Sequence, residues 1–331
     1  MKKKNIYILI FSFLIISGLH AQDIYKVENF SVVDLTGTSR YVGMGGSMGA
    51  LGADISTIFS NPAGIALFRK SEVAVTGSLQ NQPEAIEFAG VNKTRTSFDQ
   101  MGLVYTIPFS SKLKFVNFAF NYQKRRNFKN NIFAENVPLN GLSQSMQMLD
   151  LAFVDNQWLD LSNNHDREWT TPLTNLGYDT QMIYPQYNEK GELIGYDPSY
   201  AESYNYYRSQ WGGIQQFDCN LSFNYEDQIY AGLSFGIQNV NFNGATYYSE
   251  QLLDENGVTH PYYINQQEEI SGNGFDLKFG VILRPIYDSP FRIGLSIHTP
   301  TWYNLTHDSY LYMNSPYKTD NSDFSENDVQ V

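Results

Sequence analysis

The chain has 331 residues and a formal charge of −12, because 34 Asp and Glu outnumber 22 Lys and Arg. A nucleic-acid binder needs a basic surface, so this balance argues against nucleic acid as a partner. The single Cys excludes a disulfide framework and a cysteine-based zinc site. Aromatic residues make up 15% of the chain, which is far too many for a disordered protein. Charged residues make up only 17%, below the roughly 25% of ordinary soluble domains.

Residues 1–21 have the layout of a secretory signal peptide. Lysines at positions 2–4 are followed by an apolar run over residues 6–16, and Ala21 precedes a plausible cleavage point. The run is shorter than the ~20 apolar residues of a membrane-spanning helix, and a short buried helix is the alternative interpretation. An exported chain without a spanning helix is either soluble outside the membrane or crosses it as a β-barrel.

Seven later segments alternate apolar and polar residues, which predicts strands with one apolar and one polar face. In residues 217–225, for example, Phe217, Cys219 and Leu221 alternate with Asp218 and Asn220. A nine-residue strand tilted by about 40° spans roughly 21 Å, close to the apolar belt of outer-membrane barrels. A soluble sandwich alternates as well. The segments are 72–79, 101–107, 114–123, 217–225, 229–237, 275–283 and 291–298, with 309–313 as a candidate eighth.

The connections between these segments alternate strictly in length. Short ones at 110–113, 227 and 287–290 separate long ones at 81–97, 124–214 and 241–272. Bacterial outer-membrane barrels have this arrangement, with tight periplasmic turns and large external loops. We therefore predict an all-β fold, a transmembrane antiparallel barrel over residues 71–331, with 124–214 as a long external loop. That loop has a predicted hairpin tip at residues 188–191.

Residues 36–66 are rich in glycine and differ from the segments that follow. A dinucleotide-binding fingerprint would need a third glycine where Met48 stands, so we reject nucleotide binding. Small residues over 43–53 predict compact helical turns packed where space is tight. Asn61 is expected to cap a helical turn, with Pro62 at its first position and Gly64 at its end.

The segment 36–66 resembles the FadL/OmpP1/TodX family of outer-membrane transporters, whose Bacteroidetes members are often labelled hemin receptor or toluene transport protein. The resemblance implies a fourteen-stranded barrel in the outer membrane of a Gram-negative bacterium, plugged by an N-terminal hatch, here residues 22–70. It implies passive uptake of hydrophobic molecules such as long-chain fatty acids or aromatic hydrocarbons by a monomer inserted by the barrel-assembly machinery. No ligand-binding residue can be matched. The motifs are Gly-Met-Gly-Gly at 43–46, Ala-Asp-Ile-Ser-Thr at 53–57 and Asn-Pro-Ala-Gly-Ile at 61–65, and the implied hatch residues are Gly43, Gly45, Gly46, Asn61, Pro62 and Ala63.

Seven or eight strands are about half of such a barrel. A closed barrel of that size is filled by its own side chains and has no room for a hatch. An open half-barrel exposes unpaired backbone to lipid, which is costly. We therefore expect a truncated chain that does not transport as it stands.

No arrangement typical of catalysis or metal binding appears, so we expect no enzyme, no metal and no cofactor. Asp276, Lys278 and Arg292 fall on polar faces, where they either neutralise one another or bind a ligand carboxylate, and we favour mutual neutralisation. Cys219 falls on an apolar face, which favours lipid-facing packing over reactivity.

Two other functions remain open. A haem-binding outer-membrane receptor would need an axial ligand, for which His165 and His260 in the predicted external loops are the candidates. A structural or adhesive barrel without transport is the second alternative.

Overall fold

The computed structural model describes residues 30–139, 143–253 and 259–329. The predicted signal peptide, residues 1–21, lies outside them. The chain divides into two compact units, residues 1–33 and residues 34–331, and the elements described below belong to the second. The predicted hatch over 22–70 is therefore described from Asp34 onward.

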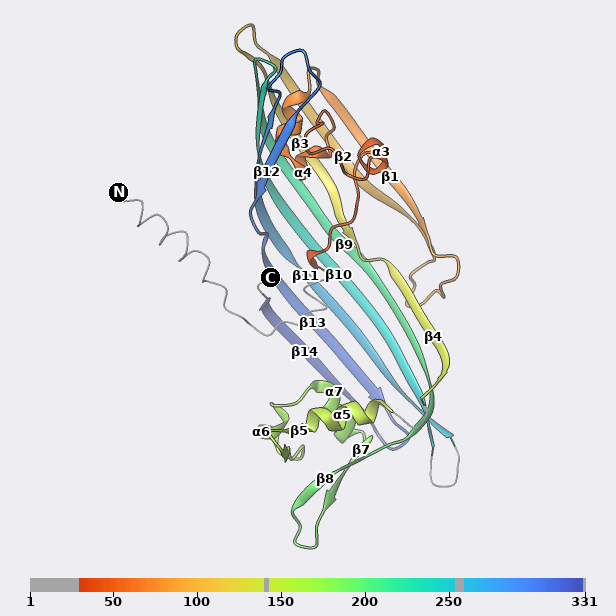
Figure 1. The fold of residues 1–331 in the computed structure, drawn as a ribbon. Coiled ribbons are helices and arrows are strands. Elements are labelled where there is room, and N and C mark those ends of the chain that lie inside the picture. The colour runs from red at the N-terminus through yellow and green to blue at the C-terminus, as the bar shows by residue number, and fades with distance from the viewer. Residues whose placement is uncertain (1–29, 140–142, 254–258, 330–331) are drawn as a thin grey trace, which may run out of the picture. The chain divides into compact units, whose positions relative to one another are not determined.

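The second unit is built on one large antiparallel sheet (Figure 1). Its strands follow the order β1-β2-β3-β9-β10-β11-β13-β14, while β4 pairs with β9 and β12 pairs with β11. The all-β prediction is confirmed, but no ladder among the described residues joins β1 to β14. The bounds are β1 Glu72–Asn81, β2 Thr94–Pro108, β3 Leu113–Asn127, β4 Asn130–Pro138, β9 Ala201–Tyr225, β10 Ile229–Leu253, β11 Thr259–Leu283, β12 Ile293–His298, β13 Trp302–Asn314 and β14 Thr319–Val329.

In two places, two consecutive strands pair with successive parts of the same neighbouring strand. β3 and β4 both pair with β9, and β12 and β13 both pair with β11. Between β12 and β13, Thr299 keeps contact with β11. Its backbone N–H donates to the Leu277 carbonyl (3.0 Å), and its hydroxyl accepts from the Leu277 N–H (3.0 Å). The side chain thus replaces a ladder acceptor where the strand is interrupted.

Each of the seven predicted strand segments overlaps a strand of the sheet, and 309–313 lies within β13. The long connections are shorter than predicted. The predicted loop 241–272 is wrong, because β10 continues to Leu253 and β11 begins at Thr259. The predicted loop 124–214 reduces to residues 139–200, because β3, β4 and β9 extend into it. In these extensions the apolar–polar alternation weakens although the backbone pairing continues.

Residues 143–200 form a small folded region, here called the cap, at one end of the sheet (Figure 1). It packs an apolar cluster against the ends of β10, β11 and β13. The cluster includes Met148, Leu176, Met182 and Tyr196 of the cap and Leu252, Tyr262, Ile264 and Met313 of the sheet. The predicted hairpin tip at 188–191 is confirmed. The cap contains α5 Gln144–Ala152, β5 Phe153–Val154, β6 Gln157–Trp158, α6 Asn164–Arg167, α7 Pro172–Asp179, β7 Ile183–Tyr187 and β8 Leu193–Pro198.

The two faces of the sheet reverse the usual pattern of burial. Along β9, Asp218, Asn220 and Ser222 are buried, whereas Phe217 and Phe223 on the other face are exposed. The same holds along β10 and β11, so we call the buried side the polar face and the exposed side the apolar face. In a globular sheet the apolar face is the one turned away from water. No helix in the described part of the chain is long and apolar enough to span a membrane.

Candidate functional site

Residues 34–68, here called the hatch, lie against the polar face as a series of short helical turns. They include α3 Ser39–Gly43, α4 Thr57–Ser60 and the 3₁₀ helix η1 Pro62–Leu67. The Thr38 hydroxyl accepts from the Tyr41 N–H (3.1 Å) and caps α3. It also donates to the Asp54 carboxylate (2.7 Å), which ties the start of the hatch to its middle. η1 contacts β3, β9, β10 and β11, so the hatch bridges four strands.

Asn61 begins η1 and joins three segments of the chain. Its Oδ1 accepts from the Ala63 N–H (3.0 Å), and its Nδ2 donates to the Gly49 carbonyl (2.6 Å) and weakly to the Val281 carbonyl of β11 (3.5 Å). Pro62 takes the first position of the helix, where its missing N–H has no cost. The predicted cap is confirmed.

The prediction that Gly64 ends the helical turn is wrong, because η1 continues to Leu67. A Cβ at Gly64 would lie 2.3 Å from the Thr57 hydroxyl oxygen and 3.2 Å from the Gly52 Cα. The residue is thus needed for a close approach between hatch segments. Its backbone carbonyl accepts from the Ala53 N–H (3.0 Å) at the same place.

Glycines of the sheet form the seat on which Asn61 and Pro62 rest. A Cβ at Gly280 of β11 would lie 1.9 Å from Asn61 Oδ1, and one at Gly232 of β10 would lie 2.4 Å from the Pro62 carbonyl oxygen. Gly294 of β12 approaches the Gly49 carbonyl in the same way (2.4 Å). Sequence reasoning placed Gly232 and Gly280 on polar faces but missed this role. The available signal was a glycine on the polar face of each neighbouring strand.

The glycine cluster at 43–46 has a different environment from the one predicted. Nothing lies within 4 Å of a Cβ placed at Gly43 or Gly45, so space is not tight there. Gly45 (φ +62°) and Gly46 (φ +74°) instead adopt left-handed conformations that end α3. The tight packing occurs at Gly52, where a Cβ would lie 2.2 Å from Leu67 Cδ1.

Four side chains of the sheet unit donate hydrogen bonds to carbonyls of the hatch. No strand of the hatch takes part in the sheet. These bonds help to hold it in place, together with apolar contacts and an ion pair between Asp34 and Arg126 (2.6 Å). Arg292 was expected to neutralise the buried carboxylates and instead belongs to this set. The bonds run from Asn117 to Ile65 (2.7 Å), from Gln123 to Thr36 (2.8 Å), from Asn220 to Pro62 (3.3 Å) and from Arg292 to Leu51 (2.7 Å).

A buried charge cluster lies on the polar face. The Lys278 ammonium is 2.9 Å from Asp218 Oδ1 and 2.5 Å from Asp276 Oδ1, with side chains between 0% and 3% exposed. The Arg125 guanidinium is 3.6 Å from Asp276 Oδ2. Two cations and two anions cancel formally, which confirms the predicted mutual neutralisation of Asp276 and Lys278. The sequence did not identify Arg125 and Asp218 as their partners.

Phe59 of the hatch lies over both cations of this cluster. Arg125 Cζ is 4.3 Å and Lys278 Nζ is 5.5 Å from the centroid of its ring. Both cations carry little exposed surface, which strengthens a cation–π contact. The charge cluster is therefore an anchor for the hatch as well as a set of ion pairs.

On the apolar face, four aromatic residues and one isoleucine occupy one row across neighbouring strands. Tyr122, Phe217, Ile237, Phe275 and Trp302 follow one another in register, from β3 through β9, β10 and β11 to β13. Ring centroids lie 5.2 Å apart for Tyr122–Phe217 and 4.9 Å apart for Phe275–Trp302. We call these five residues the aromatic row. The next outward row is polar, with Gln215, Asn239, Asn273 and Asn304.

The exposed apolar residues between the aromatic row and the short turns form a band, here called the apolar band. This band also ends sharply at the short turns, on the side away from the aromatic row. Tyr225, Ile229, Leu283 and Ile293 are in register and close the band. The turns beyond them carry charged residues, including an exposed ion pair between Lys112 and Glu226 (3.1 Å). Cys219 lies exposed within the band, as predicted.

The histidines considered as haem ligands lie in different elements. His165 lies in α6 of the cap, and His260 lies in β11. Over the ranges that the structure describes, no group of three or more His, Cys, Asp and Glu side chains has the geometry of a metal site. Comparisons of the chain with family models, with curated proteins and with solved structures gave no match.

Proposed function

We propose that the sheet is part of a β-barrel in the outer membrane of a Gram-negative bacterium, with the hatch in its interior. The barrel lets hydrophobic compounds, such as long-chain fatty acids, cross that membrane by passive diffusion. The observation that carries the proposal is the reversed burial of the sheet. Large apolar side chains cover the exposed face, while Asn, Gln, Asp and Lys lie beneath the hatch.

The size of the apolar band supports a bilayer as its surroundings. From Phe217 to Tyr225 a strand rises eight times by about 3.4 Å, or roughly 27 Å. With the ~40° tilt of barrel strands this becomes a band about 21 Å tall, near the 25 Å of outer-membrane barrels. Aromatic residues at such a boundary place an apolar ring next to lipid and a polar edge next to water.

The way the hatch is held supports a plug that can be displaced. Its carbonyls bind side chains such as Asn117 and Gln123 rather than strands of the sheet. Water can take over each of these bonds at little net cost, because a typical exchange is worth only about 1 kcal/mol. A solute that binds better when the hatch has shifted would favour the shifted state.

The cap supports an apolar solute rather than a polar one. Several of its large apolar side chains are exposed to water, and Trp169 keeps 68% of its surface. Exposed apolar side chains at the mouth of the barrel would concentrate apolar molecules by the hydrophobic effect. The exposed residues are Met146, Leu151, Phe153, Val154, Trp169, Tyr187, Ile194 and Tyr200.

Uptake of a radiolabelled long-chain fatty acid by cells with and without the full-length gene, which would encode the complete barrel, tests the proposal. Cells with the gene should take up more, and Pro62→Leu should alter the rate at equal protein level in the outer-membrane fraction. Equal uptake with correct membrane insertion would favour the structural or adhesive alternative. A chain that stays dissolved as a compact monomer without detergent would contradict the membrane placement itself.

A further inference from the structure

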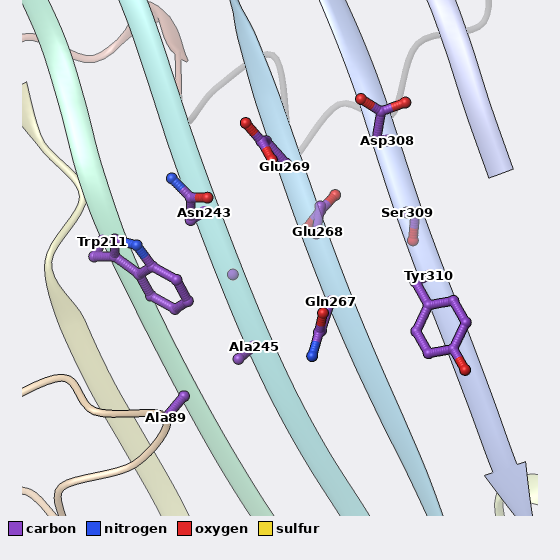
Figure 2. A pocket seen from close by; sticks show the side chains of 11 residues that line it. Ala89, Trp211, Asn243, Ala245, Gln267, Glu268, Glu269, Asp308, Ser309 and Tyr310 are labelled. Carbon is purple, nitrogen blue, oxygen red and sulfur yellow. The ribbon is translucent and has the colours of Figure 1, made fainter. Parts of the chain in front are cut away.

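The apolar face carries a groove that the transport proposal does not use. It has a volume of about 650 Å³ and lies on β9, β10, β11 and β13 between the aromatic row and the cap (Figure 2). Trp211 lies at one side and Tyr310 at the other, with polar side chains between them. Ala245 forms part of the floor, where its short side chain leaves room for a ligand.

The strand register places the groove on the outer side of the sheet. Trp211, Asn243, Glu269 and Asp308 are opposite one another across four strands. Each lies six residues along its strand from the aromatic row, and an even spacing keeps a side chain on the same face. Six rises tilted by about 40° put this row roughly 15 Å beyond the apolar band. At that height the groove lies level with the headgroups of the surrounding lipids.

The chemistry of the lining fits a neutral, hydroxyl-rich ligand. Asn243 and Gln267 offer amide donors and acceptors, and Glu269 and Asp308 offer carboxylate acceptors. Carboxylates bind hydroxyl donors well but repel phosphate and fatty-acid carboxylates. Rings such as those of Trp211 and Tyr310 supply flat apolar surfaces with a polar edge. Aromatic rings flanking amides and carboxylates suit a saccharide, which has apolar faces and a hydroxyl rim.

We propose that this groove binds neutral sugar units of a glycolipid headgroup in the outer leaflet around the barrel. The inference rests on the proposed membrane placement, which sets the groove at headgroup height. From β9 to β13 the groove spans three strand spacings, or about 14 Å, which accommodates more than one sugar unit. Binding there would hold the lipid shell in a fixed position beside the barrel wall.

The full-length protein in detergent is titrated with three probes: rough lipopolysaccharide with a complete core, its delipidated core oligosaccharide, and phosphatidylethanolamine vesicles. The folded protein should bind the first two and not retain the third specifically. Trp211→Ala should weaken binding of both sugar-bearing probes about tenfold, the loss expected for one buried aromatic contact of ~1.4 kcal/mol. Trp211→Phe should restore most of the affinity, because it keeps a flat ring.

Asn239→Ala is the matched control for Asn243→Ala, because both residues face outward on β10 and only Asn243 lines the groove. The control should bind both sugar-bearing probes as the wild type does, and Asn243→Ala should bind them more weakly. Equal affinity of all variants, or retention of the phosphatidylethanolamine vesicles alone, would overturn the groove assignment. Binding of the free oligosaccharide but not of intact lipopolysaccharide would overturn a glycolipid as its source. The detergent requirement of the same preparation reports separately on the membrane proposal.

Discussion

Gly232 and Gly280 are directly opposite one another in the β10–β11 ladder, and both closely approach Pro62 of the hatch, Gly232 beside Ala63 and Gly280 beside Asn61. Neither position has room for a methyl group, since a Cβ would lie within 2.4 Å of Pro62 O or Asn61 Oδ1. The Asn-Pro-Ala turn of the hatch therefore lies directly against the strand backbone at both glycines. This close contact couples the turn to the sheet.

Gly280→Ala is expected to push Asn61 and Pro62 off the sheet, because the Asn61 side chain and the Pro62 ring must move to relieve the overlap. Overpacking of this kind costs about 1–3 kcal/mol, and here the cost falls on the hatch–sheet contact rather than on the strand pairing. Hydrogen exchange should therefore speed up at the Ala63 amide more than within β10 and β11.

Gly244→Ala is the matched control, because it lies on the polar face of β10 and a Cβ there meets its nearest atom at 3.6 Å. The control should leave hatch exchange unchanged. Unchanged exchange in Gly280→Ala would mean that the hatch is not seated on these glycines.

The alternation of apolar and polar residues predicted the strands across the apolar band because one period-two pattern decides both faces there. In residues 229–237 the alternation assigns each side chain to one face of the strand. Beyond Ile237 the outward residues are Asn239, Asn241 and Asn243, so the pattern disappears while the pairing with β11 continues. Hydropathy alone cannot follow a strand out of an apolar environment.

The candidate site was less accessible to sequence reasoning. Asn61 and Pro62 were identified because capping is a local property of a few adjacent residues. The charge cluster joins Arg125, Asp218 and Lys278, which lie on three strands far apart in sequence. Their meeting depends on which strands are neighbours and on their exact register, and neither is encoded in any one segment.

Lys278→Met is expected to destabilise the protein strongly, because it leaves Asp218 and Asp276 buried with only Arg125 nearby. Removing one partner of a buried ion pair costs about 3–5 kcal/mol. Adding Asp218→Asn to Lys278→Met should recover part of the loss, since one uncompensated carboxylate is then removed. Denaturant unfolding followed by tryptophan fluorescence measures both variants.

The exposed pair of Lys112 and Glu226 provides the control for this charge effect. Lys112→Met should leave the unfolding midpoint unchanged, because a solvent-exposed pair contributes little. If Lys278→Met behaved like Lys112→Met, the cluster would not be buried as described.

Phe59→Leu is expected to loosen the hatch while leaving the ion pairs intact. The substitution keeps an apolar side chain but removes the ring that faces Arg125 and Lys278. A partly desolvated cation–π contact is worth about 1–2 kcal/mol, so protease should cut the hatch several times faster. Equal cleavage of the wild type and the variant would show that the two cations do not hold the ring.

The cap should lose stability in alkali through Tyr196. Its hydroxyl donates to the Leu159 carbonyl (2.8 Å) and accepts from the Leu161 N–H (2.9 Å), and burial raises the pKa of Tyr196 to about 12. An unfolded tyrosine ionises near pH 10, so the folded cap favours the neutral form. The contribution is therefore complete below about pH 10 and disappears as the pH rises towards 12.

Limited proteolysis of the cap between pH 9 and pH 12 measures this loss. Tyr196→Phe should cleave faster at neutral pH, because the Leu161 N–H loses its acceptor, but its cleavage should depend less on pH. Exposed Tyr200 gives the control, and Tyr200→Phe should follow the wild-type profile. Identical alkaline profiles for all three proteins would exclude Tyr196 as the cause.

A comparison of the variants Leu233→Arg and Asn241→Arg distinguishes a membrane protein from a soluble one. Both residues face outward on β10, but Leu233 lies at the middle of the apolar band and keeps 53% of its surface, while Asn241 lies beyond the aromatic row. An arginine at the midplane of a barrel's lipid face costs about 2–4 kcal/mol, falling to about 0–1 near the interface. Folding into lipid vesicles, followed by heat-modifiable migration, should therefore fail or slow for Leu233→Arg alone. In a soluble protein the order would reverse, because an exposed Leu replaced by Arg improves solubility, and that result would remove the basis for placing this face in a bilayer.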